Sequence, residues 1–202
     1  MPEAGCQIGI AGLGATGSNF ALNLADHGYS IAAYDRNETA LDDLRSRTEG
    51  RTIEPTNNLV EFVSLLGVPR IVMICVPSGP PIDRLINELM PNLRLGDLII
   101  DLGNHSYFKE TDARASMLAE RGIDLLGVGI SGGERGARHG AGVMPGGPKQ
   151  AYARVRRVLE DIAAEANGAP CVAYLGPRSA GHYVEMVHDG IERGVMQLIA
   201  ET

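Results

Sequence analysis

The chain has 202 residues, a formal net charge of −7 and 44% hydrophobic residues, enough to bury a sizeable core. This composition excludes a disordered protein and a small disulfide-stapled one, and the acidic balance argues against nucleic acid as a partner. The N-terminus has no signal peptide and no apolar run near the ~20 residues that span a bilayer, so no membrane contact is expected. Three widely spaced cysteines favour a reducing compartment, and we expect a cytoplasmic protein.

Short apolar runs alternate with helical patterns over the first 130 residues, as in a parallel sheet. Strands are predicted over residues 7–11, 30–34, 71–76, 98–101 and 125–128, with a shorter one at 52–53. Helices are predicted between them, over residues 17–28, 39–47, 59–66, 81–90 and 108–122. This order predicts an α/β fold with an open, doubly wound sheet that binds ligands beyond the carboxyl ends of its strands.

The rest of the chain has a different pattern. Residues 127–147 contain nine glycines, too many for a plain helix or strand. A helix is predicted over 149–165, a short strand over 171–175, and a long helix from Ser179 to the end of the sequence. We therefore expect a dinucleotide-binding domain over residues 1–178, and over 179–202 the start of a helical domain that the sequence does not contain.

A glycine motif lies directly between the first predicted strand and the first predicted helix. It has the form GxGxxG and consists of Gly12, Leu13, Gly14, Ala15, Thr16 and Gly17. In this context the glycines allow a tight turn, a close approach to a pyrophosphate, and close packing of the helix on the strand. Free amide groups at the start of the helix would hold the phosphates, so the motif predicts a dinucleotide site.

Two residues after the second predicted strand bear on the choice of cofactor. Asp35 stands 18 residues after Gly17, where a carboxylate commonly binds the ribose 2′-hydroxyl of NAD. Arg36 can bind the 2′-phosphate of NADP or stack on adenine, so the residues alone leave both cofactors open. Further cofactor contacts are predicted at Asn37, Val76, Pro77, Ser78 and Asn104.

The last predicted helix carries several titratable side chains. Glu185, His188, Asp189 and Glu192 share one helical face, and His182 lies one turn earlier. Close to a nucleotide site, such groups are candidates for acid–base chemistry, and a solvated helix face is an equal alternative. Their spacing is no firm signature of a metal site, so no metal is predicted.

Four segments resemble 6-phosphogluconate dehydrogenase, a decarboxylating enzyme: IIDLGN at 99–104, GISGGERGAR at 129–138, MPGG at 144–147 and GHYVEMVHDGIE at 181–192. The match runs from about Ile8 to the last residue. The resemblance implies a Rossmann-like, mostly parallel sheet, NADP as cofactor, and conversion of 6-phosphogluconate to ribulose 5-phosphate and CO2. It also implies a homodimer built by an all-helical domain that binds the substrate phosphate and is absent from this sequence.

The resemblance also assigns residues to roles. It makes Glu192 the general acid and assigns substrate binding to Asn104, Ser131, Gly132, Gly133 and His188. Three positions depart from the family: Glu185 replaces its catalytic lysine, while Asp189 and Arg193, predicted to contact substrate, replace an asparagine and a tyrosine.

The departure at Glu185 leaves two hypotheses open. A carboxylate can accept a proton, but it supplies no positive charge to a developing carbonyl oxygen. The first hypothesis is an NADP-dependent oxidoreductase of this type, with Glu185 as a catalytic candidate. The second is a catalytically weak or inactive nucleotide-binding homologue that acts as a sensor or partner subunit.

Overall fold

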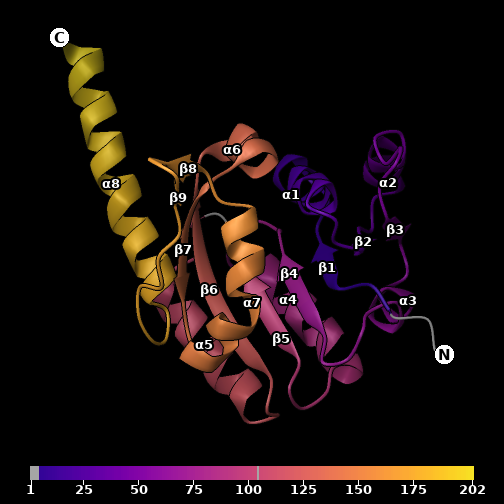
Figure 1. Cartoon of the computed structure of the whole chain (residues 1–202). Coiled ribbons are helices and arrows are strands. Elements are labelled where there is room, and N and C mark those ends of the chain that lie inside the picture. Colours follow the sequence, from indigo (N-terminus) through magenta and orange to yellow (C-terminus); the bar gives the residue numbers. More distant parts are fainter. Residues whose placement is uncertain (1–4, 104) are drawn as a thin grey trace.

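Seven strands form one sheet in the computed structural model, which describes residues 5–103 and 105–202 (Figure 1). The strand order is β3-β2-β1-β4-β5-β6-β7, with every neighbouring pair parallel except β6 and β7. The order reverses between β1 and β4, which confirms the predicted doubly wound sheet. The strands are β1 (Ile8–Ala11), β2 (Ile31–Tyr34), β3 (Ile53–Thr56), β4 (Ile71–Ile74), β5 (Leu98–Asp101), β6 (Asp124–Ser131) and β7 (Gly142–Gly146).

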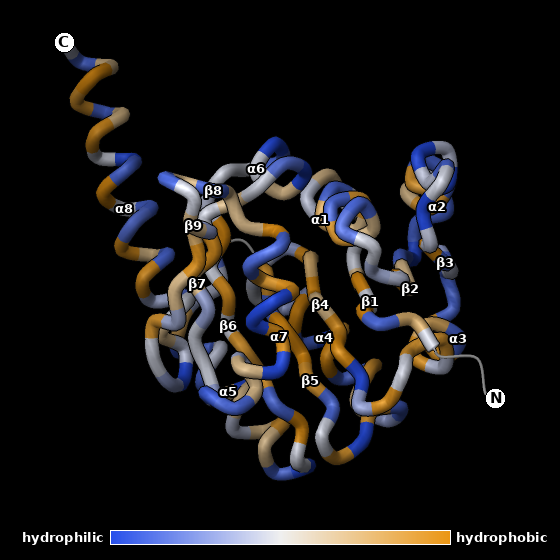
Figure 2. Tube along the Cα trace, viewed as in Figure 1, coloured by the Kyte–Doolittle hydropathy of each residue, from blue (hydrophilic) through white to orange (hydrophobic). Residues whose placement is uncertain are grey.

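Helices cover both faces of this sheet because its strands are apolar on both sides. Ile8 and Ile10 of β1 pack into one buried cluster with α1, α2 and α7, while Val72 and Ile74 of β4 pack into a second with α3, α4 and α5. Figure 2 shows this hydrophobic interior as orange segments along the strands. The helices are α1 (Ala15–Asp26), α2 (Glu38–Arg45), α3 (Leu59–Ser64), α4 (Pro80–Leu89), the 3-10 helix η1 (Met90–Asn92), α5 (Phe108–Ala119), α6 (Gly133–His139), α7 (Lys149–Asp161) and α8 (Ala180–Glu201).

The glycine-rich segment is more regular than its composition indicates. Residues 127–147 form the end of β6, the short helix α6 and the antiparallel strand β7, so the prediction of no plain strand or helix is wrong. Close packing explains these glycines, because a Cβ on Gly146 would lie 2.2 Å from the amide nitrogen of Gly181. A Cβ on Gly181 would in turn lie 2.2 Å from the carbonyl oxygen of Gly127. The glycines therefore let α8 pack directly on the backbone of β6 and β7.

Two further predictions about this half of the chain need correction. The strand predicted over 171–175 makes only isolated bridges, such as Val143 with Val172, instead of a continuous ladder. The helix predicted over 149–165 ends at Asp161, and a small hairpin of β8 (Glu165–Ala166) and β9 (Ala169–Pro170) follows. The chain then enters α8, whose first turns pack on the sheet and whose last turns extend away from it (Figure 1).

The outer half of α8 is exposed and partly apolar. Its exposed hydrophobic side chains include Ile191, Val195, Met196, Leu198 and Ile199. Within the part of the chain that the structure describes, no helix combines the length and hydropathy that a membrane span requires.

Candidate functional site

The loop between β1 and α1 has the geometry that the glycine motif predicts. Gly12 adopts a φ of +99°, and a Cβ on Gly17 would lie 1.9 Å from the carbonyl oxygen of Gly12. A Cβ on Gly14 would meet no other atom within 4 Å, so open space lies beside the loop at this point. Because Gly14 is the N-cap of α1 and has no side chain, the first amide groups of α1 are left available for an anion.

Two adjoining clefts follow this loop along the carboxyl ends of β1, β2 and β4. The first has a volume of about 170 Å³ and includes Gly12, Asp35 and Arg36 in its lining. The second has a volume of about 250 Å³ and is lined by Gly14, Ala15 and Thr16 among others. Both clefts include Val76 and Pro77, with half-buried Ser78 next in the turn between β4 and α4. The structure thus gathers the predicted cofactor residues of three loops, those after β1, β2 and β4, around one groove.

The carboxylate of Asp35 is engaged by the backbone. Its Oδ2 accepts a hydrogen bond from the amide of Leu13 at 2.7 Å, and its Oδ1 accepts one from the amide of Asn37 at 2.8 Å. Asn37 in turn caps α2, because its side chain accepts a hydrogen bond from the amide of Thr39. Asp35 therefore shapes the glycine loop, while the neighbouring Arg36 forms an ion pair with Glu88 of α4.

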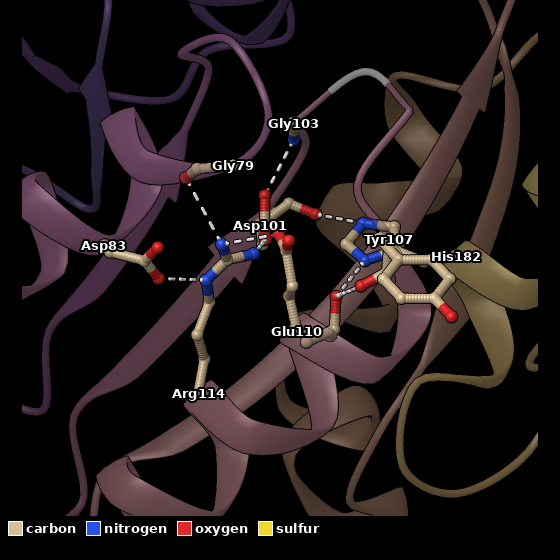
Figure 3. Close-up of polar contacts among 9 residues, drawn as sticks. Gly79, Asp83, Asp101, Gly103, Tyr107, Glu110, Arg114 and His182 are labelled. Atoms are coloured by element: carbon tan, nitrogen blue, oxygen red, sulfur yellow. Dashed lines mark hydrogen bonds and ion pairs between the residues drawn. The ribbon is translucent and has the colours of Figure 1, made fainter.

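A buried polar network supports the loops on the other side of the groove (Figure 3). Asp101, at the end of β5, is fully buried, and its Oδ1 accepts a hydrogen bond from the amide of Gly103 at 2.8 Å. The Nη1 atom of Arg114, on α5, lies 3.9 Å from Asp101 Oδ2. Its Nε donates a hydrogen bond to Asp83 Oδ1 at 2.6 Å, and its Nη2 donates one to the carbonyl oxygen of Gly79 at 3.2 Å. Burial raises the pKa of Asp101. The network therefore joins the loop after β4 to the loop after β5, which leads to Asn104, a predicted cofactor and substrate residue outside the described residues.

His182 connects α8 to the same network. Its Nε2 lies 3.1 Å from the carbonyl oxygen of Asp101, and its Nδ1 lies 2.8 Å from the hydroxyl oxygen of Thr111. Because a carbonyl oxygen only accepts hydrogen bonds, Nε2 carries the proton, and Nδ1 of the neutral ring accepts from Thr111. Burial lowers the pKa of His182, which favours this neutral form.

Glu185 lies one turn further along α8 and is also buried. Its Oε1 accepts a hydrogen bond from the amide of Ile130 at 3.3 Å, and its Cβ would be 2.5 Å from a Cβ placed on Gly129. Burial is the main cause that raises the pKa of Glu185 to about 7, and the charge of Asp189 adds to it. The alternative of a solvated helix face is therefore wrong for His182 and Glu185, whose burial the helical spacing did not reveal.

The outer predicted residues of α8 are more exposed and interact with one another. His188 Nδ1 lies 3.3 Å from Asp189 Oδ1 and 3.9 Å from Glu192 Oε2. His105, which the sequence analysis did not single out, brings its Nδ1 within 2.6 Å of Asp189 Oδ2 and accepts a hydrogen bond from Arg193 at Nε2. These groups form a polar cluster between the middle of α8 and the loop after β5.

The predicted substrate residues are divided between two clefts. Ser131 and His188 line one, whereas Asp189 and Arg193 line another together with His105. Gly132 and Gly133 have positive φ angles of +127° and +57° at the start of α6, next to Ser131. Glycine is thus favoured at these two positions because the turn into α6 requires positive φ angles.

Comparison with known proteins places this geometry in a family. The model of the NAD binding domain of 6-phosphogluconate dehydrogenase matches residues 7–176. The chain belongs to this family. Its 6-phosphogluconate dehydrogenase relatives include the NADP(+)-dependent, decarboxylating enzyme of Bacillus subtilis, 44% identical over 97% of this chain and 42% of the relative. A decarboxylating 6-phosphogluconate dehydrogenase of Saccharomyces cerevisiae is also 44% identical, over 96% of this chain and 40% of its own length.

Solved structures agree with this assignment. The 6-phosphogluconate dehydrogenase of Plasmodium falciparum superposes with a TM-score of 0.92 at 37% identity, over 97% of this chain and 42% of that one. That enzyme has been described without ligand, with NADP+ and with 6-phosphogluconate. A 3-hydroxyisobutyrate dehydrogenase of Mycobacterium tuberculosis, 22% identical with a TM-score of 0.83 over 97% of this chain and 63% of that one, shares the fold. The chain spans about two fifths of the length of its 6-phosphogluconate dehydrogenase relatives.

Proposed function

We propose that this chain supplies the NADP-binding domain of a decarboxylating 6-phosphogluconate dehydrogenase. The observation that carries the proposal is the open glycine loop at Gly14, in a chain that belongs to this family. Residues 1–178 form the dinucleotide-binding domain in this proposal, and 179–202 begin the helical domain that makes the family homodimer. The acidic charge and the spacing of the cysteines support a cytoplasmic protein that does not bind nucleic acid.

In this proposal, the cofactor binds along the two clefts beside the glycine loop. Amide groups at Ala15 and Thr16 would hold the pyrophosphate at the start of α1. Arg36 would hold the adenosine ribose, and Val76, Pro77 and Ser78 would lie beside the nicotinamide half. NADP, when bound there, supplies the acceptor for a hydride.

The substrate side would use the loops after β5 and β6 together with α8. Ser131, Gly132, Gly133 and His188, with Asn104, Asp189 and Arg193, would bind the sugar acid. Glu185 is the candidate in this chain for the base that would take the proton of the C3 hydroxyl, while bound NADP would accept the hydride from C3. The resulting 3-keto acid loses CO2, and Glu192 protonates the remaining enediol to give ribulose 5-phosphate.

A second function, that of a weak or inactive nucleotide-binding homologue, is favoured by one observation. Glu185 is buried at the position where the family has lysine, and its pKa is raised to about 7. In either protonation state it brings no positive charge to the oxygen at C3. A nucleotide sensor or a partner subunit would bind the nucleotide through the glycine loop without catalysing the reaction.

Binding and turnover measured on the same sample separate these functions. NADP and NAD are titrated by fluorescence, and NADPH formation from 6-phosphogluconate is followed by absorbance. Nucleotide binding together with NADPH formation supports the enzyme, and binding without turnover supports the inactive homologue. Failure of both nucleotides to bind contradicts both functions.

A further inference from the structure

We propose that Arg84 of α4 is a determinant of NADP selectivity, acting with Arg36 to form a two-arginine site for the 2′-phosphate. The inference rests on the proposed function, because it concerns the adenosine half of the same nucleotide site. Arg84 belongs to no motif of the sequence analysis and lies 67 residues beyond the glycine loop that ends at Gly17. The structure nevertheless places it in the lining of the cleft that holds Asp35 and Arg36.

Arg84 lies on the face of α4 that is nearest to the end of β2, where Asp35 and Arg36 line the same cleft. Glu88 stands four residues later on the same helical face and forms the ion pair with Arg36, which follows β2. One face of α4 therefore approaches Arg36, which the proposed function places at the adenosine ribose. Pro81 and Leu85 of the same helix also line this cleft and supply apolar surface on which an adenine ring can pack.

The charges at the cleft require a second cation. Asp35 and Glu88 are negative and Arg36 is positive, so without Arg84 these groups sum to −1 and would repel a phosphate that carries close to two negative charges. Arg84 is exposed and makes no ion pair with any other described residue, whereas Arg36 is already paired. Arg84 is thus the cation at this cleft whose charge is not offset by a carboxylate partner.

Glu88 gives the site a competitor for the phosphate. The side chains of Arg36 and Glu88 are 59% and 44% exposed, and exposed ion pairs of this kind contribute about 0–1 kcal/mol. A 2′-phosphate, with higher charge and three acceptor oxygens, can therefore take Arg36 from Glu88 while Arg84 binds from the other side. Without a 2′-phosphate, Glu88 keeps Arg36 in place beside the ribose.

Fragments of the two cofactors test this assignment on the 202-residue chain. Calorimetry measures the affinities of 2′,5′-ADP and 5′-AMP, which differ only in the 2′-phosphate, for the unmodified chain and for Arg84→Ala. Loss of one charged contact predicts an affinity for 2′,5′-ADP about tenfold lower, with that for 5′-AMP within about twofold. Glu88→Gln is expected to raise the affinity for 2′,5′-ADP about threefold, because the competitor for Arg36 is removed.

Arg94→Ala is the matched control, since Arg94 is an exposed arginine that does not line this cleft. It should leave both affinities unchanged. An Arg84→Ala variant that keeps the ratio of the two affinities, through equal losses or no loss, overturns the inference and leaves the proposed function intact. Failure of the unmodified chain to bind either fragment overturns the proposed function and this inference together.

Discussion

The ring of His182 on α8 lies between the carbonyl oxygen of Asp101 and the hydroxyl of Thr111, with 3.1 and 2.8 Å to its two nitrogens. Both nitrogens are therefore used when the ring is neutral, and a proton added at Nδ1 would force the Thr111 hydroxyl to turn and accept a hydrogen bond instead of donating one. This contact fixes the first turns of α8 to the end of β5. One buried imidazole thus links the helix that carries the proposed substrate residues to β5 and α5.

We predict that His182 makes the protein less stable as the pH falls. Burial lowers its pKa below the ordinary value of 6.5, so the unfolded chain binds this proton more readily than the folded one. Its contribution to stability is full above about pH 6.5 and is lost as the pH falls toward the folded pKa. Urea unfolding of the unmodified chain and His182→Asn should differ most at neutral pH. His139→Asn, at an exposed histidine of α6, is the control. If the free energies of unfolding of the unmodified chain and His182→Asn differed by the same amount at about pH 5 and at about pH 7.5, the prediction would be contradicted.

The opposite dependence is predicted for Glu185. Its pKa is raised from 4.5 to about 7, so the folded chain binds the proton more tightly, and the stabilisation present below about pH 4.5 is lost as the pH rises through 7. Glu185→Gln should therefore be more stable than the unmodified chain at about pH 8, by on the order of 1–3 kcal/mol, with no gain at about pH 4.5. Thermal or urea unfolding measures the difference. Glu192→Gln, at an exposed carboxylate of the same helix, should show no such gain.

The glycine loop allows folding to be separated from binding. Gly14→Ala adds a methyl group that meets no other atom within 4 Å, so the melting temperature should be unchanged while nucleotide affinity falls at least about tenfold, because the methyl occupies the space of the phosphate. Gly17→Ala should destabilise the whole chain, since its Cβ would lie 1.9 Å from the carbonyl oxygen of Gly12. Gly194→Ala, in an open part of α8, is the control for the added methyl. Undiminished binding by Gly14→Ala would disprove the loop as the phosphate site.

Local signals explain how much of this site the sequence could predict. The strand, glycine motif and helix around Gly14 are neighbours in the chain, so their pattern predicted both the fold and the loop. The burial of Glu185 depends on Gly129 and Ile130, about 55 residues away, and the α-helical spacing of the charged groups is the same on a buried face as on an exposed one. Arg84 and Arg114 were missed for the same reason, because each is assigned by contacts that only the folded sheet creates.

Asp35 is predicted to support both cofactors instead of selecting NAD. Its two oxygens accept hydrogen bonds from Leu13 and Asn37, so Asp35→Ala removes bonds that hold the loop and should weaken NAD and NADP by a similar factor, about three- to tenfold. Fluorescence titration with both nucleotides measures the two losses. Asp43→Ala, at an exposed carboxylate of α2, should leave both affinities unchanged. A loss confined to NAD would show that Asp35 binds the ribose directly.

Restoring a cation at position 185 should restore turnover. In a chimera, this chain replaces the matching part of the Bacillus subtilis relative, so that the remaining domain is supplied. Because one lysine would serve as base and then as cation for the C3 oxygen, we expect the unmodified chimera to turn over at least about 10³-fold more slowly than the relative.

The double variant Glu185→Lys, Asp189→Asn should recover several orders of magnitude in NADPH formation, since it also removes a carboxylate that would repel the anionic substrate. The double variant Glu165→Lys, Asp43→Asn, at exposed positions of β8 and α2, makes the same change in net charge and should recover nothing. Rapid NADPH formation by the unmodified chimera would show instead that another group of this chain performs the work of the lysine.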